Sequence, residues 1–79
     1  MQTNIYSVFV GKYETTSLAK KDLQKLNKLG LKGYLFSRGT HYSLKVFSST
    51  QEFSAINLKR KLEKIGFITD IETLTIKKD

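Results

Sequence analysis

The sequence has no cysteine, no proline and no tryptophan, and it has a single histidine among its 79 residues. Without cysteine the chain forms no disulfide and offers no thiolate as a nucleophile or metal ligand. One histidine leaves too few side chains for the usual nucleophilic or metal-binding constellations. We therefore expect neither an enzyme nor a metal or cofactor site.

Long apolar runs are also missing. Every run is far shorter than the roughly 18 residues of a membrane span, and the N-terminus does not have a charged region followed by an apolar core. We expect no transmembrane segment and no targeting signal in this chain. Nothing within residues 5–72 resembles a linker or a low-complexity segment. We expect one small domain over residues 5–76, with loose termini at 1–4 and 77–79.

Acidic residues are few, with 7 Asp and Glu against 14 Lys and Arg, which gives a net charge of +7. Eight of the basic residues fall in two segments of helical pattern: Lys20, Lys21, Lys25, Lys28, Lys59, Arg60, Lys61 and Lys64. They are interpreted either as two solvated helix faces or as a source of long-range attraction to an anionic polymer, which includes nucleic acid, a lipid surface and an acidic cell wall. Charge alone does not choose between them.

What the chain does have is an internal repeat with an offset of 36 residues. Eight pairs are identical between residues 6–36 and 42–72: Tyr6/Tyr42, Ser7/Ser43, Val10/Val46, Ala19/Ala55, Lys25/Lys61, Leu26/Leu62, Lys28/Lys64 and Gly30/Gly66. A repeat of this length is one supersecondary unit that cannot bury its apolar face alone. The two units must therefore pack together.

Each unit has the pattern strand, helix, strand. Apolar residues alternate over 5–10 and 41–47, and they recur at helical spacing around Ala19 to Leu26 and Ala55 to Ile65. Ser49 and Glu52 have the spacing of a capping box, and Gly30 and Gly66 are typical helix stops. Further strands are expected at about 32–37 and 67–73, with a hairpin turn at 37–40.

The order βαββαβ predicts an α+β domain with the ferredoxin-like, or split βαβ, fold. In this fold a four-stranded antiparallel sheet has both helices on one face, and the two strands that begin the repeats are central. Alternation then directs a second set of side chains to the uncovered face. That set is Ser7, Phe9, Lys32, Tyr34, Phe36, His41, Ser43, Lys45, Ile68, Asp70 and Glu72. An exposed face with three aromatics indicates a partner.

Asp70 and Glu72 have a spacing near that of the carboxylate pair of a glycoside hydrolase. Strand 67–73 is expected at the edge of the sheet, where charged residues prevent edge-to-edge pairing. We therefore interpret the two carboxylates as edge protection and not as a catalytic pair.

The segments 6–13 and 42–46, together with Ala19, Leu23, Leu26, Gly30, Ala55, Leu62 and Gly66, resemble the SPOR (sporulation-related repeat) domain. The family pattern is roughly Y-x-V-Q-x-G-S-F and then Y-R-V-x-V-G-P-F, each followed by A, L and G, and the resemblance covers residues 5–73. It implies a non-catalytic domain that binds peptidoglycan, in particular glycan strands without stem peptides. It also implies a bacterial location outside the cytoplasm, at the septum, the spore wall or the cell wall, within a longer protein such as a wall hydrolase or a division protein.

Carried over onto this sequence, the binding surface of the family comprises Ser7, Phe9, Lys12, Tyr34, Phe36, His41, Ser43 and Lys45. The family's glutamine falls on Phe9, the serine after its glycine on Lys12 and its arginine on Ser43, so the surface keeps its position with a different chemistry. Aromatic rings suit the apolar C–H faces of a sugar, and lysine suits the carboxylate of muramic acid.

Two alternatives remain for the open face. One is single-stranded nucleic acid, because RNA-recognition modules use the same topology and stack bases on aromatics of the central strands. However, residues 41–47 lack the basic, glycine- and aromatic-rich pattern that such modules have in the third strand. The other is that a twin subunit, in a homodimer, or a neighbouring domain covers the face.

Overall fold

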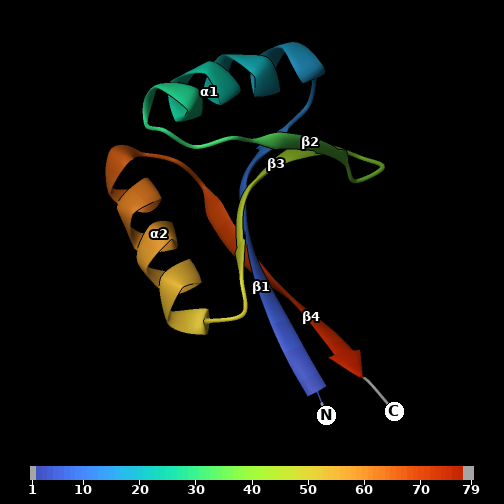
Figure 1. Ribbon diagram of the computed structural model, residues 1–79. Helices are drawn as coiled ribbons and strands as arrows, with labels where there is room; N and C mark the ends of the chain where they lie inside the picture. Colours follow the sequence, from blue (N-terminus) through green and yellow to red (C-terminus); the bar gives the residue numbers. More distant parts are fainter. Residues whose placement is uncertain (1, 78–79) are drawn as a thin grey trace.

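The computed structural model describes residues 2–77, which form four strands and two helices in the predicted order (Figure 1). Strand β1 spans Gln2–Tyr13, helix α1 Thr16–Lys28, strand β2 Tyr34–Ser37, strand β3 Tyr42–Ser49, helix α2 Glu52–Ile65 and strand β4 Thr69–Lys77. Each strand pairs antiparallel with its neighbours, in the order β2-β3-β1-β4. The α+β fold and the central place of β1 and β3 confirm the prediction.

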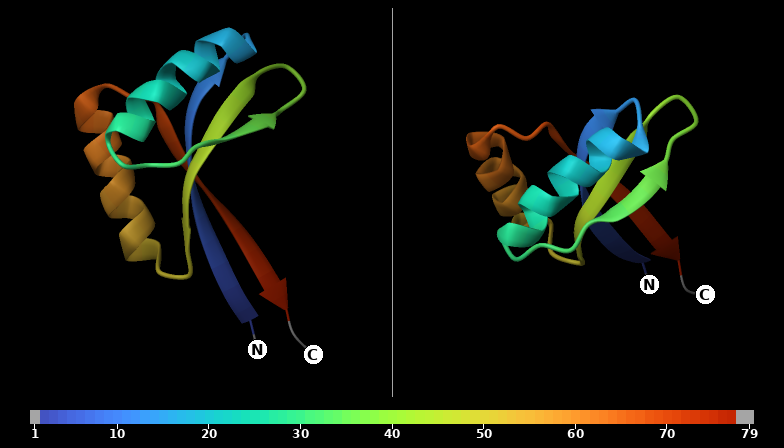
Figure 2. Two further views of the ribbon diagram at one scale, coloured as in Figure 1. Left: turned by 45° about the horizontal axis from the view of Figure 1, so that its top comes forward. Right: turned by 90° about the horizontal axis from the view of Figure 1, so that it is seen from above.

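Both helices pack on one side of the twisted sheet, as Figure 2 shows. The core between the layers consists of Val8, Val10, Tyr13, Ala19, Leu26, Leu44, Val46, Ala55 and Leu62. Three identical pairs of the repeat lie in it, Val10/Val46, Ala19/Ala55 and Leu26/Leu62. Gly30 and Gly66 have φ of 86° and 114°, the left-handed conformation expected of a helix stop. Identical residues of the repeat therefore correspond to positions in the core and at the ends of the helices.

Strand β1 contains a bulge at Gly11. Val10 pairs with Leu44 and Tyr13 with Tyr42, so β1 has one residue more than β3 between these pairs. Gly11 has φ of 75°, and a Cβ at this position would lie 2.3 Å from the Tyr13 ring. The extra residue returns Tyr13 to the core side, where its hydroxyl donates a hydrogen bond of 2.6 Å to Asp22 Oδ2. Burial first, and this hydrogen bond second, raise the pKa of Tyr13.

Strand β3 contains a second bulge. Val8 pairs with Phe47 while Phe9 pairs with Lys45, so Val46 is an extra residue in β3. Both Val46 and Phe47 then face the core side, and Ser48 joins the opposite face, where its hydroxyl lies 3.1 Å from that of Ser7. The bulge therefore shifts the alternation of the last part of β3.

Two details of the prediction were wrong. Ser49 and Glu52 do not form a capping box: the N-cap of α2 is Gln51, and the Ser49 hydroxyl accepts a hydrogen bond from the Gln51 N–H. Residues 2–4 are not loose, because they pair with residues 75–77 of β4 and extend the sheet as a two-stranded ribbon. Lys77 belongs to this ribbon too, whereas residues 1, 78 and 79 lie outside the described residues.

Candidate ligand-binding face

On the sheet face opposite the helices, the Arg38 side chain crosses from the β2–β3 hairpin to strand β4. Its guanidinium carbon lies 4.3 Å from the centroid of the Phe9 ring and 5.9 Å from that of Phe36. Its Nη2 atom donates to Glu72 Oε2 at 2.6 Å, and Nη1 lies 3.4 Å from Oε1. We call these four residues, Phe9, Phe36, Arg38 and Glu72, the Arg38 cluster.

Two aromatic rings support the cluster. Phe9 and Phe36 meet edge to face, with centroids 5.5 Å apart and planes at 65°. They come from different strands, β1 and β2, and both rings lie beside the Arg38 guanidinium. Stacking of a guanidinium on an aromatic ring combines dispersion with attraction between the cation and the ring. The arrangement holds Arg38 flat against the sheet instead of extended into solvent.

Two serines lie beneath this layer. The Arg38 Nε donates to the Ser43 hydroxyl at 3.0 Å, and Ser43 is only 3% exposed. Ser7 is 8% exposed and is paired with Ser48. The identical pair Ser7/Ser43 of the repeat therefore forms polar contacts under the open face, and both side chains are largely buried there.

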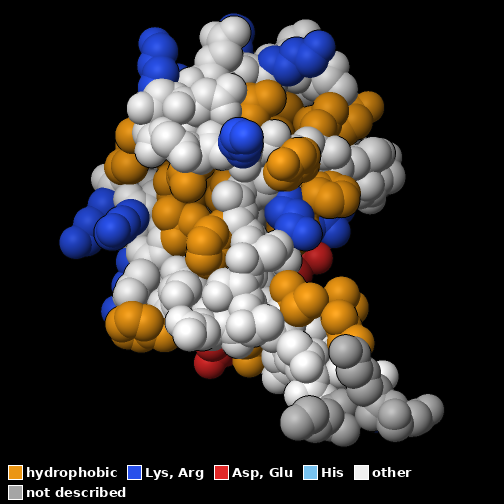
Figure 3. Space-filling model, in the orientation of Figure 1, with side chains coloured by type: hydrophobic (Ala, Val, Ile, Leu, Met, Phe, Trp, Pro, Cys, Tyr) orange, Lys and Arg blue, Asp and Glu red, His pale blue; other side chains and the backbone are white. Residues whose placement is uncertain are grey.

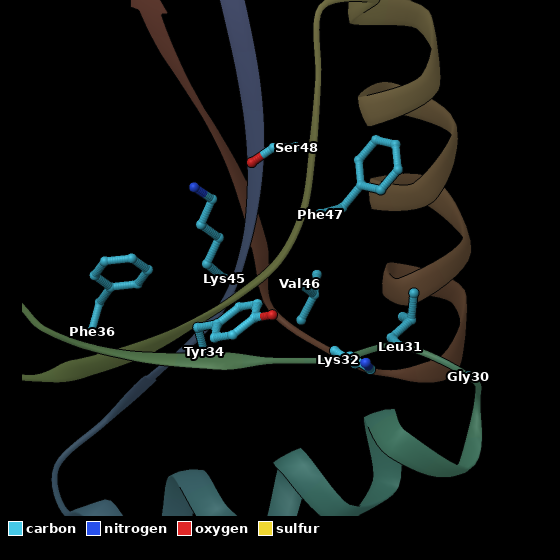
Figure 4. Close-up of a pocket in the computed structure, with 9 residues that line it drawn as sticks. All are labelled: Gly30, Leu31, Lys32, Tyr34, Phe36, Lys45, Val46, Phe47 and Ser48. Atoms are coloured by element: carbon cyan, nitrogen blue, oxygen red, sulfur yellow. The ribbon is translucent and has the colours of Figure 1, made fainter.

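Two adjoining hollows lie at this face, and the second continues around the β2 edge of the sheet toward the helix side. The first, of about 330 Å³, lies over the Arg38 cluster and extends to Leu74 on β4. The second, of about 540 Å³, lies where β2 begins, beside the second half of β3, and it includes Leu31, Tyr34, Phe47 and Ser48 (Figure 4). Phe36 and Lys45 line both hollows. Together they form one surface that crosses the edge of the sheet at β2.

The surface combines apolar and basic groups. Tyr34 is 63% exposed and Phe36 40%, and the Lys45 Nζ lies 5.9 Å from the centre of the Phe36 ring. Basic side chains lie between groups of hydrophobic ones on the right of the space-filling view, with acidic atoms beside them (Figure 3). Apolar platforms next to cations suit a ligand with apolar faces and negative charges.

The predicted site residues fall into three groups. Tyr34, Phe36 and Lys45 line the hollows. Ser7, Phe9 and Ser43 lie on the same face but are largely buried, and of these Ser7 and Phe9 also line the first hollow. Phe9 is only 9% exposed because Arg38 lies over it. Lys12, in the β1 bulge, and His41, in the hairpin loop with Nδ1 3.1 Å from Thr40 Oγ1, line neither hollow.

Arg38 was missed by sequence reasoning, and Glu72 was assigned a different role. Alternation assigns strand residues to faces, but Arg38 lies in the loop between β2 and β3 and had no predicted face. Glu72 was interpreted as edge protection, and β4 is indeed an edge strand. One feature of the sequence could have pointed to Arg38: a long basic side chain in a hairpin beside a predicted aromatic face can reach across that face.

Within residues 2–77, no group of three or more His, Asp or Glu side chains is arranged to hold a metal ion. In the same range neither helix is long and apolar enough to cross a membrane.

Comparison with known proteins identifies the class of fold. No protein-family model and no curated protein matches the sequence. Among solved structures, the chain is similar to the peptidoglycan-binding domain of the B. subtilis cell wall lytic enzyme CwlC. The TM-score is 0.76 with 14% sequence identity, and the match covers 91% of each chain. The two proteins share one fold over nearly their whole length.

Proposed function

We propose that this chain is a non-catalytic peptidoglycan-binding module that uses the open face of its sheet to hold an attached protein on the bacterial cell wall. The observation that carries the proposal is the pair of adjoining hollows, which meet at Phe36 and Lys45 on a fold shared with a peptidoglycan-binding domain. The resemblance of the sequence to the SPOR domain supports the same function.

The chemistry of the face suits a glycan strand. The exposed Tyr34 and Phe36 rings offer flat apolar surfaces for the C–H faces of sugars. Lys45 and Arg38, and Lys32 at the groove, offer positive charge to the muramic acid carboxylates of strands without stem peptides. The surface is extended rather than enclosed, as a polymeric ligand requires.

The two carboxylates on the open face of the sheet are not arranged as a pair that hydrolyses a glycan. Glu72 is ion-paired with Arg38, and its neighbour Asp70 lies on the same face of β4 opposite Phe9. An inverting or retaining glycosidase needs a protonated carboxyl group beside a second carboxylate. In the proposed function these two residues therefore have no catalytic role.

The location follows from the ligand. A peptidoglycan-binding module acts outside the cytoplasm, and peptide-free glycan is produced where amidases remodel the wall. We therefore place the attached protein at sites of wall remodelling, such as the division septum or the spore wall.

The test is cosedimentation with purified peptidoglycan sacculi before and after an amidase removes the stem peptides. We expect binding to both, with more protein in the pellet after the amidase treatment. Absence of binding to sacculi, together with retention on an oligo-U column at physiological salt, would contradict the proposal and favour nucleic acid.

A further inference from the structure

The Arg38 guanidinium already holds a carboxylate. Both of its terminal nitrogens face the two oxygens of Glu72, at 2.6 and 3.4 Å, in the fork arrangement by which arginine recognises carboxylates. Its Nε is fixed by Ser43, and one face of its plane lies against Phe9. Contacts with Ser43 on β3, Phe9 on β1 and Glu72 on β4 thus orient the guanidinium, and its two terminal nitrogens point along the face toward β4.

The carboxylate in this fork is held loosely. The side chain of Glu72 is 53% exposed, whereas that of Arg38 is 29% exposed. An ion pair with this exposure contributes little to stability because water and salt compete for both groups. Glu72 can therefore leave while Ser43, Phe9 and Phe36 keep the guanidinium in place.

We propose that Arg38 is the residue that recognises a carboxylate of the ligand, and that Glu72 occupies its place in the free protein. On binding, a carboxylate of the sugar polymer replaces Glu72 in the fork of Arg38, and Glu72 turns into solvent. The inference rests on the proposed function and adds to it the acidic group that the site selects. The ligand class is a polymer of sugars that bear carboxylates. An arginine, and not a lysine alone, recognises these carboxylates.

The neighbourhood of the fork fits this exchange. The hollow over the Arg38 cluster is lined by Lys45 on one side and by Leu74 on the other. Lys45 adds a second positive charge near the incoming carboxylate. The apolar Leu74, which is 60% exposed, offers a surface to the carbon skeleton of the sugar.

A pair of glycans that differ only in charge tests the proposal. Peptide-free strands are compared with the same strands after carbodiimide coupling of methylamine, which converts each carboxylate into a neutral amide. The wild-type chain should bind the charged strands about tenfold more tightly than the amidated ones, as for a charge-assisted hydrogen bond at a partly exposed site. In Arg38→Gln and Arg38→Lys this ratio should fall to about twofold or less, because neither side chain has the fork.

Glu72→Gln removes the competing carboxylate, and Asp70→Asn is its matched control. Both substitutions remove one negative charge from the same face of β4, but Asp70 makes no ion pair with Arg38. Glu72→Gln should bind the charged strands about two- to fivefold more tightly than Asp70→Asn, the fold-change expected for release of one exposed ion pair. Binding of the amidated strands should be equal in the two variants.

The Nε–Hε resonance of Arg38 gives a second readout that does not depend on affinity ratios. It should shift on titration with charged strands and stay in place with amidated ones. Amide spectra of the variants establish that each is folded before its affinity is compared.

The outcomes separate this inference from the function on which it rests. If sacculi bind the wild type, but charged and amidated strands bind equally and Glu72→Gln matches Asp70→Asn, Arg38 does not recognise a carboxylate while the wall function stands. If Glu72→Gln strengthens binding of both strands, Glu72 only keeps Arg38 over Phe9, and the carboxylate exchange is wrong. If the wild type binds no sacculi, both proposals are wrong.

Discussion

At the scale of single residues, Tyr13 shows how a bulge residue acquires a buried polar contact. It is 9% exposed, and its hydroxyl donates to Asp22, whose carboxylate also lies 3.8 Å from Lys25 Nζ. Burial and the adjacent carboxylate disfavour the phenolate, so the pKa of Tyr13 in the folded chain is raised. A proton that is held more tightly in the folded than in the unfolded chain stabilises the fold at low pH and ceases to do so as the pH rises.

The raised pKa of Tyr13 leads to a prediction for the pH dependence of stability in Tyr13→Phe. Below pH about 10, the ordinary pKa of tyrosine, the free energy of unfolding of the variant should be lower by about 1 kcal/mol because the hydrogen bond to Asp22 is lost. Above pH about 10 the unfolded wild type releases its phenolic proton while the folded chain retains it, so the wild type loses stability that the variant keeps. Urea unfolding between pH 7 and 11 measures the difference, and a constant difference over this range would contradict the assignment.

The exposed aromatics lead to a prediction for binding. Phe36→Ala and Tyr34→Ala should each weaken binding to peptide-free glycan by about 1–3 kcal/mol, by analogy with stacking on exposed aromatics. Phe53→Ala is the control, because Phe53 is 73% exposed but lies on α2, away from the open face. Titration calorimetry measures the binding free energies. Equal losses of binding free energy in all three variants would contradict a specific role of the rings on the open face.

Phe9 needs separate treatment, because it is both on the binding face and buried. A Phe9→Ala substitution removes a ring that contacts Arg38 and Phe36, so we expect a loss of about 3 kcal/mol in the free energy of unfolding. For this reason Phe9 is not a clean probe of binding, and the sequence prediction that treated Phe9 and Phe36 as equivalent exposed rings was wrong on this point.

At the scale of elements, the repeat and its alternation predicted the order of strands and helices, the central strands and most of the core. From the alternating segments 5–10 and 41–47, Val8, Val10, Leu44 and Val46 lie in the core, because hydrophobic alternation specifies the register of a half-buried strand. The bulges were not predicted. Alternation presumes an unbroken period of two, and an extra residue at Gly11 or Val46 moves the later residues of the strand to the other face. Gly11 was the only visible signal of the first bulge, and the second had none.

Gly11 provides the test of the first bulge. In Gly11→Ala, the new Cβ meets the Tyr13 ring at a backbone conformation that side chains disfavour. We expect a loss of about 2–4 kcal/mol in the free energy of unfolding, from strain and from displacement of a core residue.

Gly39→Ala is the matched control for strain alone. Gly39 has φ of 88°, but no atom lies within 4 Å of a Cβ built there. Gly39→Ala should lower the free energy of unfolding by about 1 kcal/mol, because the alanine must adopt a left-handed backbone conformation but its Cβ meets no other atom. Denaturant unfolding of both variants measures the difference, and equal losses would contradict the role of Gly11 in seating Tyr13.

At the scale of the whole molecule, charge and binding chemistry are separated. The basic side chains of α1 are exposed on the side that carries the helices, whereas Arg38, Lys45 and the aromatics lie on the opposite side of the sheet. The β1–β4 ribbon extends the molecule, whose dimensions are 42 by 27 by 16 Å. The helix face can increase the rate of encounter with an anionic wall, but the shaped surface is on the sheet.

This separation could be predicted from the sequence, since helical and strand periods assign the lysines and the aromatics to different faces. The Arg38 cluster could not, because it depends on the path of a loop side chain across three strands. The sequence analysis interpreted Asp70 and Glu72 as protection of the sheet edge. In the structure Glu72 is neutralised by Arg38 and forms part of the candidate site.

The central claim is that the open sheet face binds peptide-free glycan, and a map of backbone amide shifts during titration with these strands tests it most directly. The largest shifts should fall in residues 7–9, 34–38 and 43–45 and at Glu72, with small shifts in α1 and α2. If the largest shifts fall on the lysines of the two helices and vanish as salt is raised, binding is a charge effect of the helix face, and the assignment of the site to the sheet face is wrong.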